Sequence, residues 1–199
     1  MPRIKLTKSE LKIQRDNLKR FTRFLPTLQL KKQQLQTETQ YVKDEITGFL
    51  QEKEEFEKKL LAWVKLCCRS NFSDCAEIIT AKETNMEIRN VAGVDVPFFK
   101  AQDFSVQICD FYETEPWFDD LIKAVKTLYS FEKQEEILQE RFELLEQELR
   151  ITNQRVNLFE KVMIPDAKEN IRKIQIYMGD QQIAAVGRSK IAKRKLEAS

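Results

Sequence analysis

Few side chains in this sequence are suited to metal binding or catalysis, and their spacing does not favour either. Four cysteines, Cys67, Cys68, Cys75 and Cys109, are the best candidate metal ligands, and the chain contains no histidine. The cysteines lack the paired C-x-x-C spacing of a zinc site, which only these thiols or carboxylates could complete. We therefore expect reduced thiols and no metal site.

The elements that support phosphate chemistry are also missing. None of the four glycines begins a G-x-x-x-x-G-K-[ST] loop, no Gly-rich strand-to-helix turn is present, and no histidine can serve as a general base. Carboxylates are abundant, but on charged helices such side chains are overwhelmingly solvated. The sequence predicts a chain without catalytic residues and without a cofactor.

Charge is distributed unevenly along the chain. Residues 1–35 carry +8 and residues 165–199 carry +4, so the remainder carries −10 of a net +2. The candidate contact residues are the cations near the two ends. They are Lys5, Lys8, Lys12, Arg15, Lys19, Arg20, Arg188, Lys190, Lys193 and Arg194.

The composition favours long helices, because 199 residues include only four glycines and five prolines. No segment has the roughly 18 apolar residues that span a bilayer, and the N-terminus does not resemble a signal peptide. We expect a cytoplasmic chain without direct membrane insertion.

A heptad pattern runs through both halves of the sequence. In the first half, one line is Phe21, Leu28, Leu35, Val42, Phe49, Phe56 and Trp63, and its mostly apolar companion line is Leu18, Leu25, Lys32, Thr39, Ile46, Lys53, Leu60 and Cys67. In the second half, one line includes Leu121, Leu128, Glu135, Phe142, Leu149, Val156 and Met163, and the other includes Phe131, Leu138, Leu145, Thr152 and Phe159. We call these positions the seam.

The expected fold is mainly α: a long antiparallel two-helix, left-handed coiled coil with a small β-hairpin region between the helices. Helices of about 58 residues would be roughly 85–90 Å long. Antiparallel pairing would bring the basic ends together. The expected segments are an N-terminal helix over 1–69, a connecting region with a short helix and a hairpin over 70–116, and a C-terminal helix with a basic tail over 117–199.

Polar and proline residues interrupt the seam. Pro26 and Pro165 should each kink or restart a helix, because proline removes a backbone hydrogen bond. Lys53 and Glu135 occupy seam positions at similar heights, and we expect them to interact and help fix the register. Pro116 is expected to open the second helix.

Helical periodicity fails between about Ser70 and Pro116. Residues 86–89 and 94–98 alternate around an Ala92-Gly93 turn, which indicates a β-hairpin. Its main residues are Ile88, Val91, Gly93, Val94, Val96 and Phe98. Phe104, Val106 and Ile108 could form a third strand or an extended return. The apolar face of the hairpin must lie on the helices or on another protein.

Three stretches resemble the D subunit of V-type (vacuolar and archaeal-type) ATPases. They are the L-P-T-L-Q-L-K-K-Q-Q-L-Q run over residues 25–36, the N-V-A-G-V-D-V-P turn over 90–97, and the R-V-N-x-x-E-x-x-x-I-P run over 155–165. The last is the most specific, with Arg155, Val156, Asn157, Glu160, Ile164 and Pro165 at fixed positions. The L-P-T variant suggests a bacterial branch.

The resemblance implies the axle of a rotary motor, a central stalk that couples ATP hydrolysis or synthesis to ion transport, including proton transport. It implies contacts between the basic ends and a ring of catalytic A and B subunits. It also implies a small companion, the F subunit, together with a socket subunit on the membrane ring and a location peripheral to the membrane.

Three other functions share some of these features. A prefoldin-like chaperone also joins paired helices through hairpins, but its helix tips carry exposed apolar residues, whereas these tips are basic. Nucleic-acid binding by the basic ends has no recognised module in its favour, so we expect no nucleic-acid partner. A generic coiled-coil scaffold is the remaining alternative.

Overall fold

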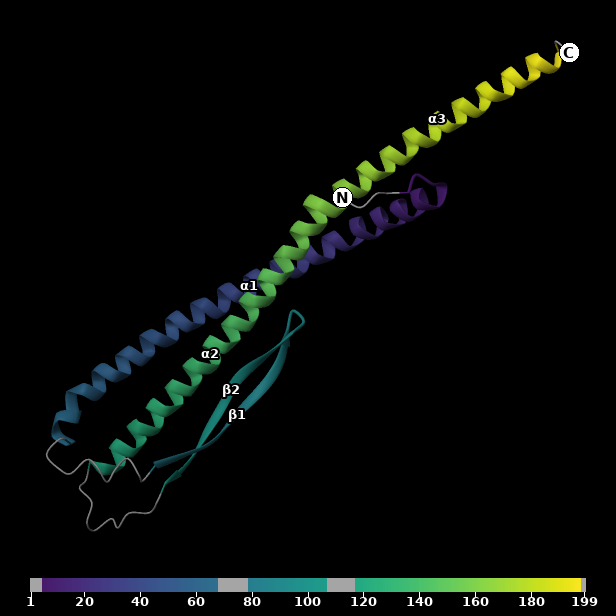
Figure 1. Cartoon of the computed structure of the whole chain (residues 1–199). Helices are drawn as coiled ribbons and strands as arrows, with labels where there is room; N and C mark the ends of the chain where they lie inside the picture. Colours follow the sequence, from purple (N-terminus) through teal and green to yellow (C-terminus); the bar gives the residue numbers. More distant parts are fainter. Residues whose placement is uncertain (1–4, 68–78, 107–116, 198–199) are drawn as a thin grey trace. The chain divides into compact units, whose positions relative to one another are not determined.

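The computed structural model of the chain describes residues 5–67, 79–106 and 117–197 (Figure 1). Helix α1 spans Lys8–Cys67 and is followed by strands β1, Ile79–Val91, and β2, Val94–Val106. Helix α2 then spans Phe118–Leu158, a π-helical turn, η2, spans Phe159–Met163, and helix α3 spans Ile164–Glu197. The expected mainly α fold with two long helical segments and a hairpin between them is confirmed.

The chain divides into two compact units. One consists of Met1–Lys32 with Ile151–Ser199, and the other is Gln33–Arg150. Helices α1 and α2 each contribute residues to both units, whereas the hairpin belongs to the second unit and α3 to the first. Within 70–116, the described residues 79–106 form the hairpin, so the expected short helix, like Pro116, lies outside the described residues.

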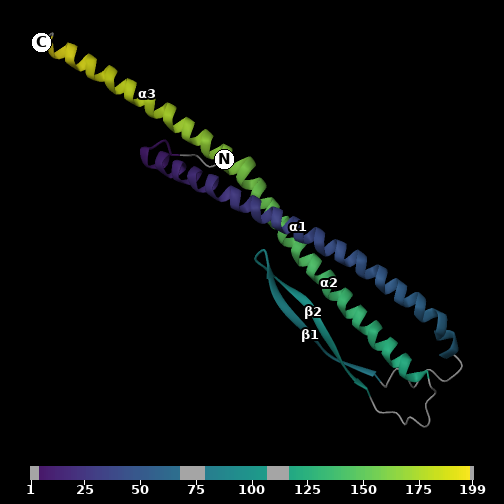
Figure 2. The ribbon, with the colours of Figure 1, turned by 180° about the vertical axis from the view of Figure 1, so that it is seen from behind.

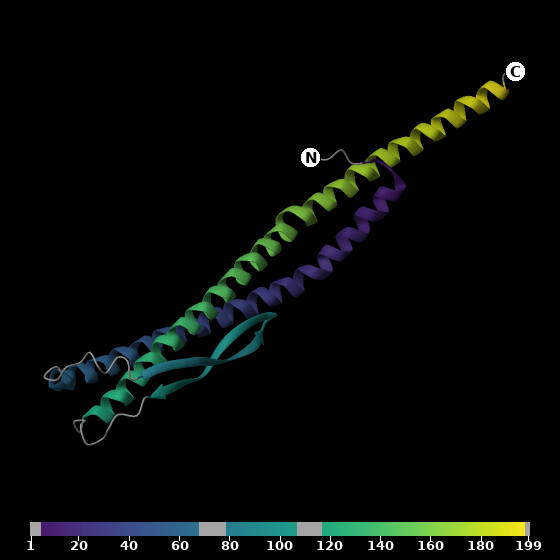
Figure 3. The ribbon, with the colours of Figure 1, turned by 60° about the horizontal axis from the view of Figure 1, so that its bottom comes forward.

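In the unit Gln33–Arg150, α1 and α2 lie side by side and run antiparallel (Figures 1 and 3). The Phe131 ring makes edge-to-face contacts with Phe49 and Phe56, at centroid distances of 5.4 and 5.5 Å. The expected Lys53–Glu135 interaction is confirmed, with Nζ 2.6 Å from Oε2. These pairs join the later part of α1 to the early part of α2, as antiparallel helices require.

Burial follows the heptad pattern in both helices. Leu35, Val42 and Leu145 are fully buried, and no seam residue whose side chain is described is exposed. The side chain of Trp63 lies outside the described set. By contrast, Leu30 and Leu61, which the heptads leave off the seam, are 57% and 65% exposed. The helices are therefore held by the residues of the seam, while the left-handed supercoil stays a prediction.

The hairpin forms because Ala92 and Gly93 both adopt positive φ, 51° and 82°, as a two-residue turn between twisted strands requires. The Asn90 side chain supports the turn by accepting a hydrogen bond from Gly93 N–H and donating one to Asp95. Phe104 and Val106 belong to β2 itself, so a third strand is not formed by them. Ile108 lies outside the described residues.

The hairpin lies beside α2 (Figure 2), and one of its faces completes the core of this unit. Val96 is fully buried with Leu35, Val42 and Leu145, and Val91, Val94 and Phe98 pack around them. Ile88 lies on the opposite face and is 74% exposed. The apolar face of the hairpin therefore lies on the helices, one of the two arrangements expected for it.

The helical run changes phase at η2. Continued heptads would extend the Phe159 line to Asp166 and Lys173, yet both are exposed, whereas Ala167 and Ile174 are 3% and 0% exposed. The buried line has moved by one residue. The π turn supplies that residue, because the N–H of Ile164 donates to the carbonyl of Phe159, five positions back.

Pro165 explains why the extra residue is placed at this point. It has no N–H to donate to the carbonyl of Lys161, and its ring would crowd that carbonyl in a regular α-helix. The π turn widens the backbone and α3 restarts at Ile164, with proline in its first turn. The restart expected at Pro165 is thus confirmed. At Pro26, α1 continues without a restart, so a kink there stays a prediction.

We predict that removing the π turn requires two changes. Deleting the exposed Lys161 restores the heptad phase but leaves Pro165 inside a regular α-helix, which costs about 3 kcal/mol. Adding Pro165→Ala should recover most of the lost stability, because Ala167 and Ile174 then stay on the buried line. Thermal unfolding followed by circular dichroism measures both variants. Equal midpoints for the deletion with and without Pro165→Ala would contradict this account.

The Lys53–Glu135 pair predicts a pH dependence of stability. The hydrogen bond from Lys53 to Glu135 raises the pKa of Lys53 above its usual 10.5. A raised lysine pKa stabilises the fold below the unfolded value, and that contribution is lost as pH rises through the folded value. Glu135→Gln should lower stability by about 1 kcal/mol at neutral pH. The difference from the native chain should shrink above pH 10.5, and a constant difference in urea titrations would refute the assignment.

Candidate functional site

The candidate site is built from the two helical segments of the unit Met1–Lys32 and Ile151–Ser199. Thr7 immediately precedes α1, and its Oγ1 accepts a hydrogen bond from the N–H of Glu10 at 3.3 Å. Leu11 is 8% exposed, and farther along, the Phe21 ring lies edge-on to Phe159 at 5.4 Å. These contacts hold the first turns of α1 against the helices on the C-terminal side of the chain.

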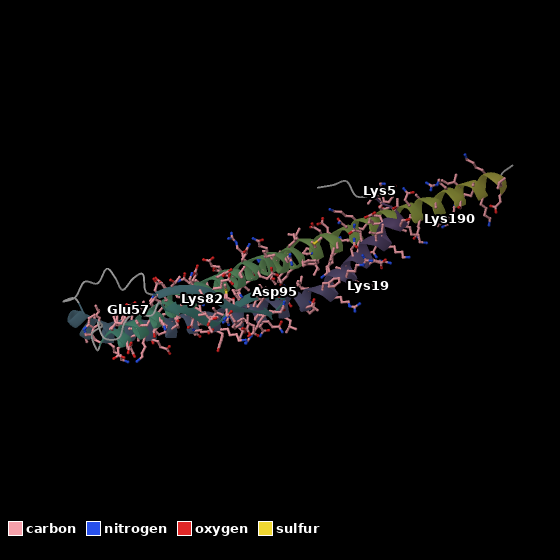
Figure 4. The ribbon with its side chains drawn as sticks, turned by 90° about the horizontal axis from the view of Figure 1, so that it is seen from below. Lys5, Lys19, Glu57, Lys82, Asp95 and Lys190 are labelled. Carbon is pink, nitrogen blue, oxygen red and sulfur yellow. The ribbon has the colours of Figure 1, made fainter. Side chains whose placement is uncertain are left out.

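All ten candidate cations are exposed, as their positions off the buried lines require. Lys5 precedes α1, five others lie on its first turns, and the remaining four lie near the end of α3. Figure 4 shows Lys5 and Lys19 on the N-terminal portion and Lys190 farther along α3. The fold therefore brings the two basic sets into one unit but separates them along α3.

The separation arises from unequal helix lengths. Helix α1 has 60 residues, whereas α2, η2 and α3 follow one another for 41, 5 and 34. The longer run extends α3 past the first turn of α1, as Figures 1 to 3 show. For the described residues, the expectation that the two basic ends lie side by side is therefore not fulfilled.

The last turns of α3 have no burial within the part of the chain that the structure describes. Every position from Asp180 to Glu197 is exposed. The stretch carries apolar side chains as well as cations, with Ile183 73% and Ile191 59% exposed. Sequence reasoning identified the cations in this stretch but missed these apolar residues, although they are apparent once the buried line is followed past Ile174.

The cations of the site are scarcely neutralised. Of the ten, only Lys193 has an ion pair among the described residues, with Glu197 at 3.6 Å on the surface of α3. Nearby, Lys173 pairs with Glu169 at 2.6 Å, and this hydrogen bond lowers the pKa of Glu169 below its usual value. Unpaired exposed cations leave a positive potential available to an acidic partner.

No catalytic or metal site is assembled by the residues that the structure describes. Among them, no three His, Cys, Asp or Glu side chains gather as metal ligands would. The cysteine side chains lie outside the described set. None of the helices in the described ranges carries an apolar stretch of the length that crossing a bilayer requires.

Comparison with known proteins identifies the family. The family model described as the D subunit of ATP synthase matches residues 10–194. The chain belongs to this ATP synthase D-subunit family. It is 43% identical to the V-type ATP synthase D subunit of Borreliella burgdorferi over 98% of this chain and 96% of that protein. It is 34% and 32% identical to the proteins of the same name from Chlamydia muridarum and Chlamydia pneumoniae, over 98% of this chain and 96% and 93% of theirs.

The most specific of the three stretches that suggested this family, residues 155–165, surrounds the π turn. Val156 is buried, Asn157 and Ile164 are half-buried, and Arg155, Glu160 and Pro165 are exposed. Glu160 lies within η2, and Pro165 is the second residue of α3. The D-subunit resemblance and the bacterial assignment are thus confirmed by the comparisons. The most specific motif coincides with the phase change of the helical run.

The exposed end of α3 predicts a contrast in amide exchange. Residues 167–178 include buried positions, whereas 180–197 form a helix without buried side chains, and isolated helices of that length are marginal in water. Amides of 180–197 in the purified chain should exchange at least about tenfold faster than those of 167–178. Hydrogen–deuterium exchange with mass spectrometry measures this contrast, and equal protection of both segments would contradict it.

Proposed function

We propose that this chain is the central rotor stalk of a rotary V-type ATPase or ATP synthase. In this role it couples ATP hydrolysis or synthesis in a catalytic hexamer to ion translocation through a membrane ring. The observation that carries the proposal is the exposed end of α3, which offers cations and apolar side chains to a partner outside the chain. Family membership supports this role over a chaperone or a generic scaffold.

The contact with the catalytic ring is assigned to the basic ends. Lys5, Lys8, Lys12, Arg15, Lys19 and Arg20 would act from the α1 side, and Arg188, Lys190, Lys193 and Arg194 from α3. Because these cations are exposed and almost entirely unpaired within the described residues, they add long-range attraction toward acidic surfaces. The exposed apolar residues of α3 would then supply the short-range contact.

The proposed mechanism is mechanical. A helix pair whose surface differs around its long axis presents different faces to three catalytic interfaces at once. Each 120° step then favours a different open or closed state at each interface. The hairpin contributes to the difference in faces, since it packs on one side of α1 and α2 within its unit. The chain transmits rotation and does no chemistry itself.

The other contacts are proposed from the same role. The catalytic A and B subunits would surround the basic ends, while the small F subunit and a socket subunit on the membrane ring would bind elsewhere on the chain. The protein would then be cytoplasmic and peripheral to the membrane, as part of the membrane-bound complex. The division into an N-terminal helix over 1–69, a connecting region over 70–116 and a C-terminal helix with a tail over 117–199 would match these tasks.

We predict that truncation before Gly187 separates folding from coupling. Residues 187–197 are exposed, so the isolated chain should keep its unfolding midpoint. Ion transport driven by ATP should fall in a complex reconstituted with the truncated chain. A truncated chain that drives the ring as well as the intact chain would overturn the assigned role of α3.

A full-length variant isolates the effect of charge. Replacing Arg188, Lys190, Lys193 and Arg194 with Gln keeps the helix length and its apolar residues. Its association rate with the catalytic hexamer should fall by roughly tenfold at low ionic strength, with weaker dependence on salt. Stopped-flow fluorescence measures this rate. An unchanged rate with unchanged salt dependence would show that the cations do not guide association.

A further inference from the structure

Arg141 is a buried arginine that joins three elements of the unit Gln33–Arg150. It lies on α2 and is 5% exposed. Its Nη1 donates to Oε2 of Glu45 on α1 at 3.2 Å, and its guanidinium carbon lies 4.1 Å from the ring centroid of Phe98 on β2. One side chain of α2 therefore contacts both the neighbouring helix and the hairpin.

The placement is energetically demanding. A guanidinium removed from water is unfavourable unless paired, and removing one partner of a buried pair leaves an uncompensated charge. Glu45 supplies the opposite charge, and the face of Phe98 offers the negative side of its quadrupole. The Nε of Arg141 has no acceptor among the described residues. The two contacts with Glu45 and Phe98 thus largely determine where this arginine is tolerated.

A second arginine, Arg89, also lies over the Phe98 ring, but it does not join the hairpin to the helices. Arg89 lies 4.9 Å from the Phe98 centroid, but it belongs to β1 and pairs with Glu87 on its own strand at 3.0 Å. Its contacts are therefore internal to the hairpin. Val96 is the one hairpin residue fully buried among those described. Val91, Ala92, Val94 and Phe98 pack around it, and the Phe104 ring lies 6.5 Å from that of Tyr129 on α2. A two-stranded hairpin is marginal by itself, so its position depends on these apolar contacts together with the polar anchor, Arg141.

We propose that Arg141 is a positioning residue that fixes the hairpin on the helix pair, and that the hairpin can be released from the helices when this contact is lost. The helices have contacts of their own, including the Phe49–Phe131 ring pair and the Lys53–Glu135 ion pair, neither of which involves the hairpin. Release of the hairpin therefore leaves α1 and α2 paired. This inference goes beyond the role of the chain as a rotor stalk.

Hydrogen–deuterium exchange on the full chain tests the proposal. Arg141→Met keeps an unbranched side chain but removes the charge and the planar group. Amides of 91–98 should then exchange about tenfold faster, while those near Phe49 and Phe131 keep their native rates. Arg141→Lys keeps the positive charge without the stacking plane, and should give an intermediate rate in the hairpin.

Lys53→Met is the matched control, because it breaks an ion pair between the same two helices without touching the hairpin. It should leave hairpin exchange unchanged. Phe98→Leu should accelerate hairpin exchange. Combining it with Arg141→Met should add little, because both substitutions remove the same contact, that of the Arg141 guanidinium with the Phe98 ring. Native hairpin rates in Arg141→Met, or equally faster exchange in hairpin and helices, would overturn the proposal. If Arg141→Met does not fold, Arg141→Lys is judged by the same two outcomes.

Discussion

Burial of the narrow apolar seam along each long helix is the constraint on which the rest of the structure depends. A helix of 60 residues is far longer than the average helix of a globular domain, and most helical stability in water comes from packing an apolar face. In α1 that face is narrow, because the residues between Leu35 and Val42 are half-buried or exposed. Every other feature must leave this line continuous or compensate where it is interrupted.

The π turn is such a compensation. The line could be predicted from the sequence as far as Phe159, because apolar residues recur there with the heptad period. Beyond it, the period leads to Asp166 and Lys173, whereas the packed residues are Ala167 and Ile174. The sequence does contain the one-residue shift, because each polar residue at the heptad position is followed directly by an apolar one. Its cause was not visible, because a single-residue insertion can be absorbed by several backbone geometries.

The hairpin shows a different limit of sequence reasoning. Its turn was predictable, because alternating residues on either side of Ala92-Gly93 leave few other conformations. The docking of the hairpin was not, because Arg141 flanks the seam beside Phe142, and an arginine beside a seam normally reaches solvent. Its burial becomes favourable only when Phe98 and Glu45 are brought to the same place. Interactions that need three separate segments leave no periodic signal in any one of them.

Charge placement can be understood by the same physical reasoning. In the unit Gln33–Arg150, several cations pair across or along the helices, as Lys53, Arg141 and Lys133 do with neighbouring carboxylates. At the basic ends nearly all the candidate cations lack such partners. Unpaired like charges on one unit repel one another and add nothing to its stability. The fold itself does not require these cations beside the exposed apolar residues of α3, which is why we assign them to the proposed contact with an acidic partner surface.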